Sequence, residues 1–185
     1  MITPPSPLQH NKPSQIQLRQ HAQWLLFLIF AITINMVEAS LPSLGPWFKP
    51  GLANIITLLV LFIWGAKAAL ILATARVIVS ALLIGTLFTP TFIIAISATL
   101  SSTLVMVIFY MLIPKPKTIT ISLLGATVHI TVQFIVVETL FIQQHALYYL
   151  LPPLLFLACI TGWLNGAIAA YTLKHFSLRG LNNQL

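Results

Sequence analysis

Residues 51–88 decide the fold, and they read GLANIITLLVLFIWGAKAALILATARVIVSALLIGTLF. This stretch carries two charged side chains, Lys67 and Arg76, and otherwise consists mostly of aliphatic, aromatic and small residues. A helix needs about 20 apolar residues to cross the hydrocarbon core of a bilayer, so the stretch holds two membrane helices. Its first part, 51–65, covers only about 22 Å, which favours a helix that starts below the interface or is partly re-entrant.

The composition of the whole chain agrees with this interpretation. Of 185 residues, 58% are apolar and only 6% are charged, and the mean hydropathy is +0.98. Soluble domains carry about 25% charged residues because their surface must be solvated. Intrinsic disorder is excluded as well, since it requires low hydrophobicity. The composition therefore predicts an all-α, polytopic membrane protein, folded as one compact bundle.

Breaker clusters between the apolar runs predict six transmembrane helices. We expect them at 23–41, 51–65, 66–88, 91–113, 118–142 and 147–173. The polar, proline-containing residues 1–20 are expected to form a disordered cytoplasmic tail. The membrane domain then spans 21–175, and 176–185 form a second cytoplasmic tail.

The basic residues predict the orientation of these helices. With the N-terminus inside, the cytoplasmic side receives seven of the nine, namely Lys12, Arg19, Lys67, Lys115, Lys117, Lys174 and Arg179, and the outside receives only Lys49. Such an excess is typical of cytoplasmic loops, and it explains the basic pI of about 10.0 without a nucleic-acid partner. We therefore expect a multi-pass protein of the bacterial inner membrane with both termini in the cytoplasm.

Several classes of chemistry are excluded by the residues that are missing. The chain has no Asp and only two Glu, so it has no aspartate-rich magnesium motif and no Ser-His-Asp triad. Cys159 is the only cysteine, which removes disulfides and cysteine-based metal sites. Neither a P-loop nor a GxGxxG motif is present. We expect no catalytic residue, no metal and no cofactor.

Ionisable and amide side chains within the apolar runs are the candidate functional residues, because such groups are costly in a bilayer. Arg76 lies nine residues beyond Lys67, or about 13 Å into the membrane. His129 lies inside the fifth run, and Gln133 follows one turn later on the same helix face. Each has a purely structural alternative: Arg76 can tie helices together, and His129 can serve as an interhelical hydrogen bonder.

A second group of candidates lies toward the outer side of the membrane. Glu38 and Glu138 fall near the outer ends of their helices, where a charge can also simply be solvated. Lys49 and Asn54 belong to the sequence Lys-Pro-Gly-Leu-Ala-Asn, which opens the short run. This segment either presents backbone N–H groups and Lys49 to an anion or is an ordinary helix start. We take Glu38, Lys49, Asn54, Arg76, His129 and Gln133 as the expected substrate-binding residues.

Small residues spaced four apart predict helix–helix contacts. One stripe comprises Gly65, Ala69 and Ala73, and the other contains Gly162 and Gly166. Such stripes allow two helix backbones to approach closely. The helix that packs on them belongs either to a partner protein or to the same bundle.

The stretch from Glu38 to Gly166 resembles the heptaprenyl diphosphate synthase component I family, also called the Gx transporter family. The matching residues are Glu38, Leu41-Pro42, Lys49 to Ile55, Gly65, Lys67, Arg76, Gly85, His129, Gln133, Tyr149-Leu150, Pro152 and Gly162. Family members usually show His-Asn-x-Gly-Gln, whereas this chain reads His129-Ile130-Thr131-Val132-Gln133, so no role of that Asn is carried over.

The resemblance implies two different functions. The family label implies the non-catalytic membrane subunit of a heptaprenyl diphosphate synthase. The hydrophobic architecture is similar to the S components of energy-coupling factor transporters, which bind a vitamin-like substrate and work with a membrane coupling subunit and ATPases. Prenyl chain elongation needs Mg²⁺ held by clustered aspartates, which this chain lacks.

We favour the substrate-binding role, for a small anionic, vitamin-like or isoprenoid-like molecule whose identity the sequence leaves open. A membrane partner in redox or flavoprotein maturation is a third possibility.

Overall fold

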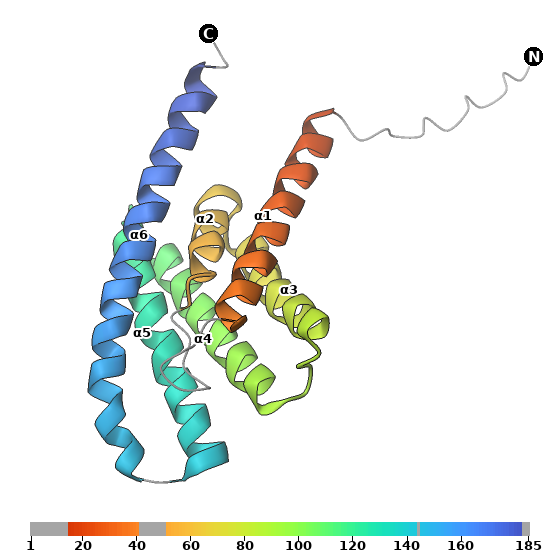
Figure 1. The fold of residues 1–185 in the computed structure, drawn as a ribbon. Coiled ribbons are helices and arrows are strands. Elements are labelled where there is room, and N and C mark those ends of the chain that lie inside the picture. Colours follow the sequence, from red (N-terminus) through yellow and green to blue (C-terminus); the bar gives the residue numbers. More distant parts are fainter. Residues whose placement is uncertain (1–14, 41–50, 144, 183–185) are drawn as a thin grey trace, which may run out of the picture.

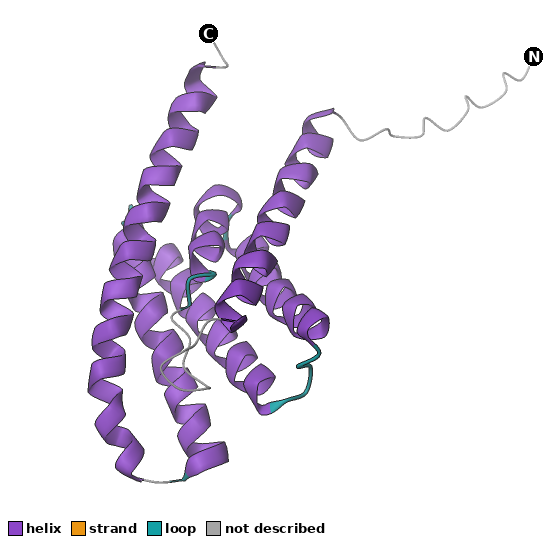
Figure 2. Ribbon diagram, in the orientation of Figure 1, coloured by secondary structure: helices purple, strands orange, loops and turns teal. Residues whose placement is uncertain are grey.

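The chain folds into a bundle of six α-helices in a computed structural model, which describes residues 15–40, 51–143 and 145–182 (Figures 1 and 2). No strand occurs within these ranges. The helices are α1 (Gln15–Ser40), α2 (Asn54–Trp64), α3 (Ala66–Ile84), α4 (Pro90–Leu112), α5 (Thr118–Val137) and α6 (Leu151–Asn182). A π-helical turn, Glu138–Ile142, extends α5, and a 3₁₀ segment, His145–Leu150, precedes α6. The predicted all-α membrane bundle is confirmed.

The helices pack in chain order around the short helix α2. Helix α5 packs against α4 on one side and α6 on the other, while α3 joins α4 to α1. The start of α1 and the end of α6 lie at the same end of the bundle (Figure 1). This arrangement places the loop 85–89 and the turn at residue 143 toward the opposite end.

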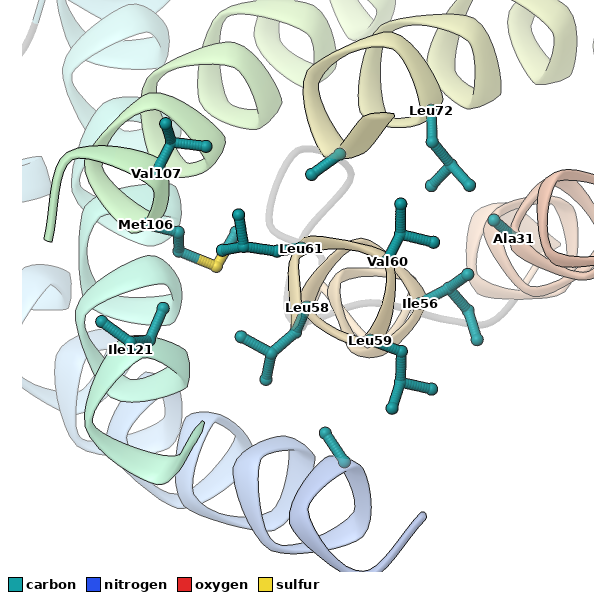
Figure 3. Close-up of a cluster of buried hydrophobic side chains, with 12 residues drawn as sticks. Ala31, Ile56, Leu58, Leu59, Val60, Leu61, Leu72, Met106, Val107 and Ile121 are labelled. Carbon is teal, nitrogen blue, oxygen red and sulfur yellow. The ribbon is translucent and has the colours of Figure 1, made fainter. Parts of the chain in front are cut away.

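Helix α2 forms the centre of the core although it is too short to cross a bilayer. In the described part of the chain, five helices are long and apolar enough to span a membrane, whereas α2 has only 11 residues. Figure 3 shows α2 with its side chains directed toward α1, α3, α4 and α5. The residues packed there include Ala31, Ile56, Leu58, Leu59, Val60, Leu61, Leu72, Met106, Val107 and Ile121. The short run therefore forms a half-helix enclosed by the other five.

Four residues explain where the helices break. Gly65 has φ +84° and separates α2 from α3, a backbone conformation that favours glycine. Gly85 ends α3 in the left-handed region, with φ +76°, so this helix stops four residues before the expected 88. Thr89 caps α4 by accepting a hydrogen bond from the Phe92 amide at 3.4 Å, and Pro90 occupies the first helical position, where its missing N–H costs nothing.

The ends of the bundle differ in detail from the expected boundaries. Helix α1 already begins at Gln15, within the segment expected to be a tail, and α6 continues to Asn182, beyond the expected 173. The prolines of the sixth run, Pro152 and Pro153, lie in the first turn of α6, where no intrahelical N–H bond is lost. The polarity of the sequence predicts these helix ends poorly, because a helix can continue beyond the membrane into water, where its residues need not be apolar.

One of the two small-residue stripes, that of Gly162 and Gly166, lies at a helix–helix contact within the bundle. A Cβ on Gly166 would lie 2.7 Å from the Ile119 Cα, and one on Gly162 would lie 3.2 Å from the Leu123 Cα, so both glycines let α6 approach the α5 backbone. The residues Ala69 and Ala73 are fully buried on α3. Gly65 lies at the α2–α3 break and not inside a helix as expected, and a Cβ there would meet nothing within 4 Å.

Candidate functional site

A tight turn directly before α2 directs three backbone N–H groups toward one point in the middle of the bundle. Gly51 starts this turn with φ +72°, and its carbonyl accepts a hydrogen bond from the Asn54 amide at 3.0 Å. The residue at the N-cap position, Ala53, offers no capping side chain. The first amides of a helix lack intrahelical partners and lie at the positive end of its dipole. This turn is therefore built to receive an anionic group.

The anionic group that occupies the turn is the carboxylate of Glu38, from the end of α1. One carboxylate oxygen accepts hydrogen bonds from the amides of Gly51 and of Leu52, the latter at 3.1 Å. The other oxygen accepts a longer bond from the Ala53 amide at 3.4 Å. Glu38 is only 3% exposed. Glu38 is therefore not simply solvated at the end of its helix, because α2 starts deep inside the bundle and not at its outer surface.

Arg76 supplies the positive charge next to this turn. Its guanidinium donates a hydrogen bond from Nη2 to the Asn54 Oδ1 at 2.6 Å, and the residue is 2% exposed. Glu38 is the opposite charge that acts on it. The Arg76 Nε has no hydrogen-bond partner within the described part of the chain. Because a buried N–H without a partner is costly, this atom marks a place where a further acceptor would be stabilised.

His129 closes the site from the α5 side. A Cβ on Gly51 would lie 3.5 Å from the His129 Cδ2, so the imidazole ring lies directly over the turn. One ring nitrogen, Nε2, lies 3.1 Å from the Gln133 Nε2, and the other, Nδ1, lies 3.4 Å from the Ser102 Oγ on α4. The predicted pairing of His129 and Gln133 one helical turn apart is present.

Asn165 reaches the same turn from α6. Its Nδ2 donates to the Gly51 carbonyl at 3.5 Å, and its Oδ1 has no partner among the described residues. Asn165 is 3% exposed. Asn35 precedes Glu38 by one turn of α1, Ser80 follows Arg76 by one turn of α3, and the two join these helices by a hydrogen bond of 2.6 Å. All six helices thus contribute side chains to one buried group, which we call the cluster around Arg76. Its members are Glu38, Asn54, Arg76, Ser102, His129, Gln133 and Asn165.

The structure brings together five of the six predicted substrate-binding residues: Glu38, Asn54, Arg76, His129 and Gln133. The sixth, Lys49, lies outside the described residues. Glu138 is separate, at the start of the π-helical turn. Sequence reasoning missed Ser102 and Asn165 as members of the site. The sequence offered one signal for them, namely that each is a polar residue within an apolar run. Serine is common in such runs, and a single Asn is weak evidence for a site.

No metal centre is apparent in this cluster. No group of three or more His, Cys, Asp or Glu side chains gathers anywhere in the described ranges. Besides the Glu38 carboxylate, the polar groups around the turn are a guanidinium, amides, a hydroxyl and an imidazole. These groups suit hydrogen bonding to an organic anion.

The family relationship agrees with the extent of the bundle and its site. Residues 27–172 match the family model described as heptaprenyl diphosphate synthase component I. The chain belongs to this family. The match runs from the second half of α1 into α6 and includes every residue of the cluster, so the predicted resemblance is confirmed. No curated protein and no solved structure matches this component I family member significantly.

Proposed function

We propose that the protein is a non-catalytic membrane subunit that captures a small anionic molecule in the cluster around Arg76, in the manner of the S component of an energy-coupling factor transporter. The observation that carries this proposal is the buried Arg76, which donates to Asn54 at the start of the half-helix α2 and whose Nε has no partner among the described residues. Discontinuous helices that begin near the middle of the membrane bind anionic substrate groups at their N-termini in several transporter folds.

The chemistry of the cluster supports binding and not catalysis. A substrate-binding site needs a few precisely placed polar groups, and Arg76, Asn54 and Asn165 are such groups. Elongation of a prenyl diphosphate needs metal ions to neutralise the leaving diphosphate. The chain has no Asp, and its two Glu residues lie at separate places, Glu38 in the cluster and Glu138 at the end of α5.

The family membership favours a second function, that of the component I subunit of a heptaprenyl diphosphate synthase. In this role the chain works with a separate catalytic component and supplies the membrane side of the assembly. The cluster around Arg76 would then hold the diphosphate end of a prenyl chain, which is also anionic. The two functions therefore share an anion site and differ in the partner and in the ligand.

The decisive experiment is native mass spectrometry of the protein extracted gently from its own membrane, together with the subunits that remain bound. We expect a small anionic molecule to accompany the wild-type chain and to be absent from the Arg76→Ala variant. Lys115→Ala, on the connection between α4 and α5, serves as the matched control and should retain the molecule.

The identity of the bound material separates the two functions. A water-soluble, vitamin-sized anion together with ATPase subunits supports the transport role. A prenyl diphosphate together with a soluble synthase component supports the synthase role. Wild-type protein that carries no small molecule in either assembly would refute the proposed capture function.

A further inference from the structure

We propose that Glu38 is a built-in occupant of the anion site, and that the carboxylate of a substrate displaces it. This inference rests on the proposed capture function and names both its ligand class and its exchange step. In the structure, the carboxylate of Glu38 already accepts hydrogen bonds from the amides of Gly51, Leu52 and Ala53. The site is thus fitted to a carboxylate, and the one present belongs to the protein.

The first support comes from the two unpartnered atoms beside this carboxylate. Arg76 Nε is a donor and Asn165 Oδ1 is an acceptor, both residues are more than nine-tenths buried, and neither atom has a partner within the described ranges. Glu38 leaves both atoms unsatisfied. A small molecule with a carboxylate and an added hydroxyl or amine group offers an acceptor to the first and a donor to the second.

The second support is the packing of the helix that carries Glu38. Only 11% of the α1 span, Ala22–Ala39, is buried inside the bundle, against 39% of the spans of α3, α4 and α5. Large side chains of α1 such as Leu26 and Ile29 are 64% and 60% exposed, so they face lipid. A helix with few bundle contacts can shift with little loss of packing. Among α1, α3, α4 and α5, the helix that carries Glu38 is therefore the one most readily displaced.

Two states follow from this arrangement. In one, Glu38 holds the turn and balances the charge of Arg76, so that the ligand-free site does not leave a buried arginine without an opposite charge. In the other, the substrate carboxylate takes over both contacts and Glu38 leaves together with the end of α1. Because the site has to exchange one anion for another, the apparent dissociation constant of the substrate equals the intrinsic one divided by the fraction of time that Glu38 leaves the turn free.

The test uses mandelate as the probe, because it is a small carboxylate with a hydroxyl donor and an apolar ring. Its dissociation constant is measured by thermal stabilisation of the purified full-length protein in detergent, for the wild type and for Glu38→Gln. We expect Glu38→Gln to bind mandelate about tenfold or more tightly than the wild type, because the competing carboxylate no longer occupies the turn. Glu138→Gln removes the other carboxylate of the chain and should bind like the wild type.

Two further probes and one further variant complete the design. Mandelamide, which lacks the negative charge, should stabilise neither protein, and phenyl phosphate should stabilise Glu38→Gln less than mandelate does. Should Glu38→Gln fail to fold, Glu38→Asp keeps the charge on a shorter side chain that reaches the amides less well, and it should also bind mandelate more tightly.

The outcomes separate this inference from the proposed function. Equal or weaker binding of mandelate by Glu38→Gln, or no effect of mandelate on it, would overturn the displacement proposal. The capture function would then still stand if a small anion accompanies the wild-type chain in native mass spectrometry and is lost from Arg76→Ala. A stronger effect of phenyl phosphate than of mandelate would also overturn the assignment of a carboxylate ligand.

Discussion

At the scale of single residues, the site depends on the backbone conformation of Gly51. Its φ of +72° costs a residue with a side chain roughly 1 kcal/mol or more, and a Cβ would also lie 3.2 Å from the Asn54 Nδ2 and 3.5 Å from the His129 ring. Gly85 has almost the same φ, +76°, but a Cβ there would meet nothing within 4 Å. Comparing substitutions at these two glycines therefore distinguishes the effect of backbone strain from the effect of contact with the site.

We predict that Gly51→Ala lowers the melting temperature of the detergent-solubilised protein more than Gly85→Ala does. Gly85→Ala carries the backbone strain alone, whereas Gly51→Ala also displaces Asn54 or His129. Ligand stabilisation should be weakened only in Gly51→Ala. Equal effects of the two substitutions on both measurements would show that the turn is not packed against the site.

The polar side chains of the site could largely be predicted from the sequence, because each interrupts an apolar run. Arg76 and His129 are predictable in this way, and the structure places His129 over the turn and Arg76 in a hydrogen bond to Asn54 at its end. Asn165 was missed because its contact with Gly51 joins residues that are 114 positions apart. A single sequence contains no information on such a pairing. The binding roles of these residues stay predictions.

At the scale of the elements, the contact between α5 and α6 depends on the absence of side chains on Gly162 and Gly166. The Ser122 Oγ strengthens the contact by donating to the Gly162 carbonyl at 2.7 Å. Gly125, on α5, contacts α4 instead, where an added Cβ would meet the flexible side chain of Met106 at 2.6 Å. All three glycines lie within helices, so alanine improves the helix propensity at each by a similar amount, about 1 kcal/mol.

We predict that Gly166→Ala destabilises the bundle, whereas Gly125→Ala is nearly neutral. An alanine at position 166 meets the Ile119 Cα at 2.7 Å, which only a movement of the helices relieves, while Met106 can change its rotamer. Thermal denaturation in detergent measures both. A Gly166→Ala variant that is as stable as Gly125→Ala would contradict the close approach of α5 and α6.

The number and order of the helices were predictable, but the role of α2 was only partly so. Its short length indicated a helix that does not cross the membrane fully, and 11 residues bear this out. Its central position could not be predicted, since lipid and protein surroundings both select apolar side chains such as Leu58 and Val60. The end of α3 at Gly85 was missed because the apolar run continues beyond this glycine.

At the scale of the whole molecule, the arrangement of the first and last helices leads to a test of the orientation in the membrane. The start of α1 and the end of α6 lie on one side of the bundle (Figure 1), and seven of nine basic residues are expected on that side. We predict that, in cells carrying Cys159→Ala, a cysteine at Lys115 is protected from an impermeant thiol reagent and one at Phe88 is labelled. Phe88 is 83% exposed, so burial in the bundle does not protect it. The reverse pattern would invert the orientation.

The absence of aspartate also leads to a prediction for the whole molecule. We expect the purified chain alone to form no polyprenyl product from isopentenyl diphosphate and an allylic diphosphate with Mg²⁺, as measured by radiolabel incorporation. The same assay with a soluble synthase component added tests the component I role. Magnesium-dependent elongation by the isolated chain would contradict its assignment as a non-catalytic subunit.

The central claim, that the buried cluster around Arg76 binds a small anion, is tested most directly by the thermal stabilisation that the co-purified molecule confers. At a concentration one hundredfold above its dissociation constant, a ligand stabilises the folded state by about 2.7 kcal/mol. We predict that the wild type and Lys115→Ala show this increment and that Arg76→Ala loses it. If Arg76 only ties helices together, Arg76→Ala will melt at a lower temperature without ligand yet retain the full increment, and that result would contradict the account.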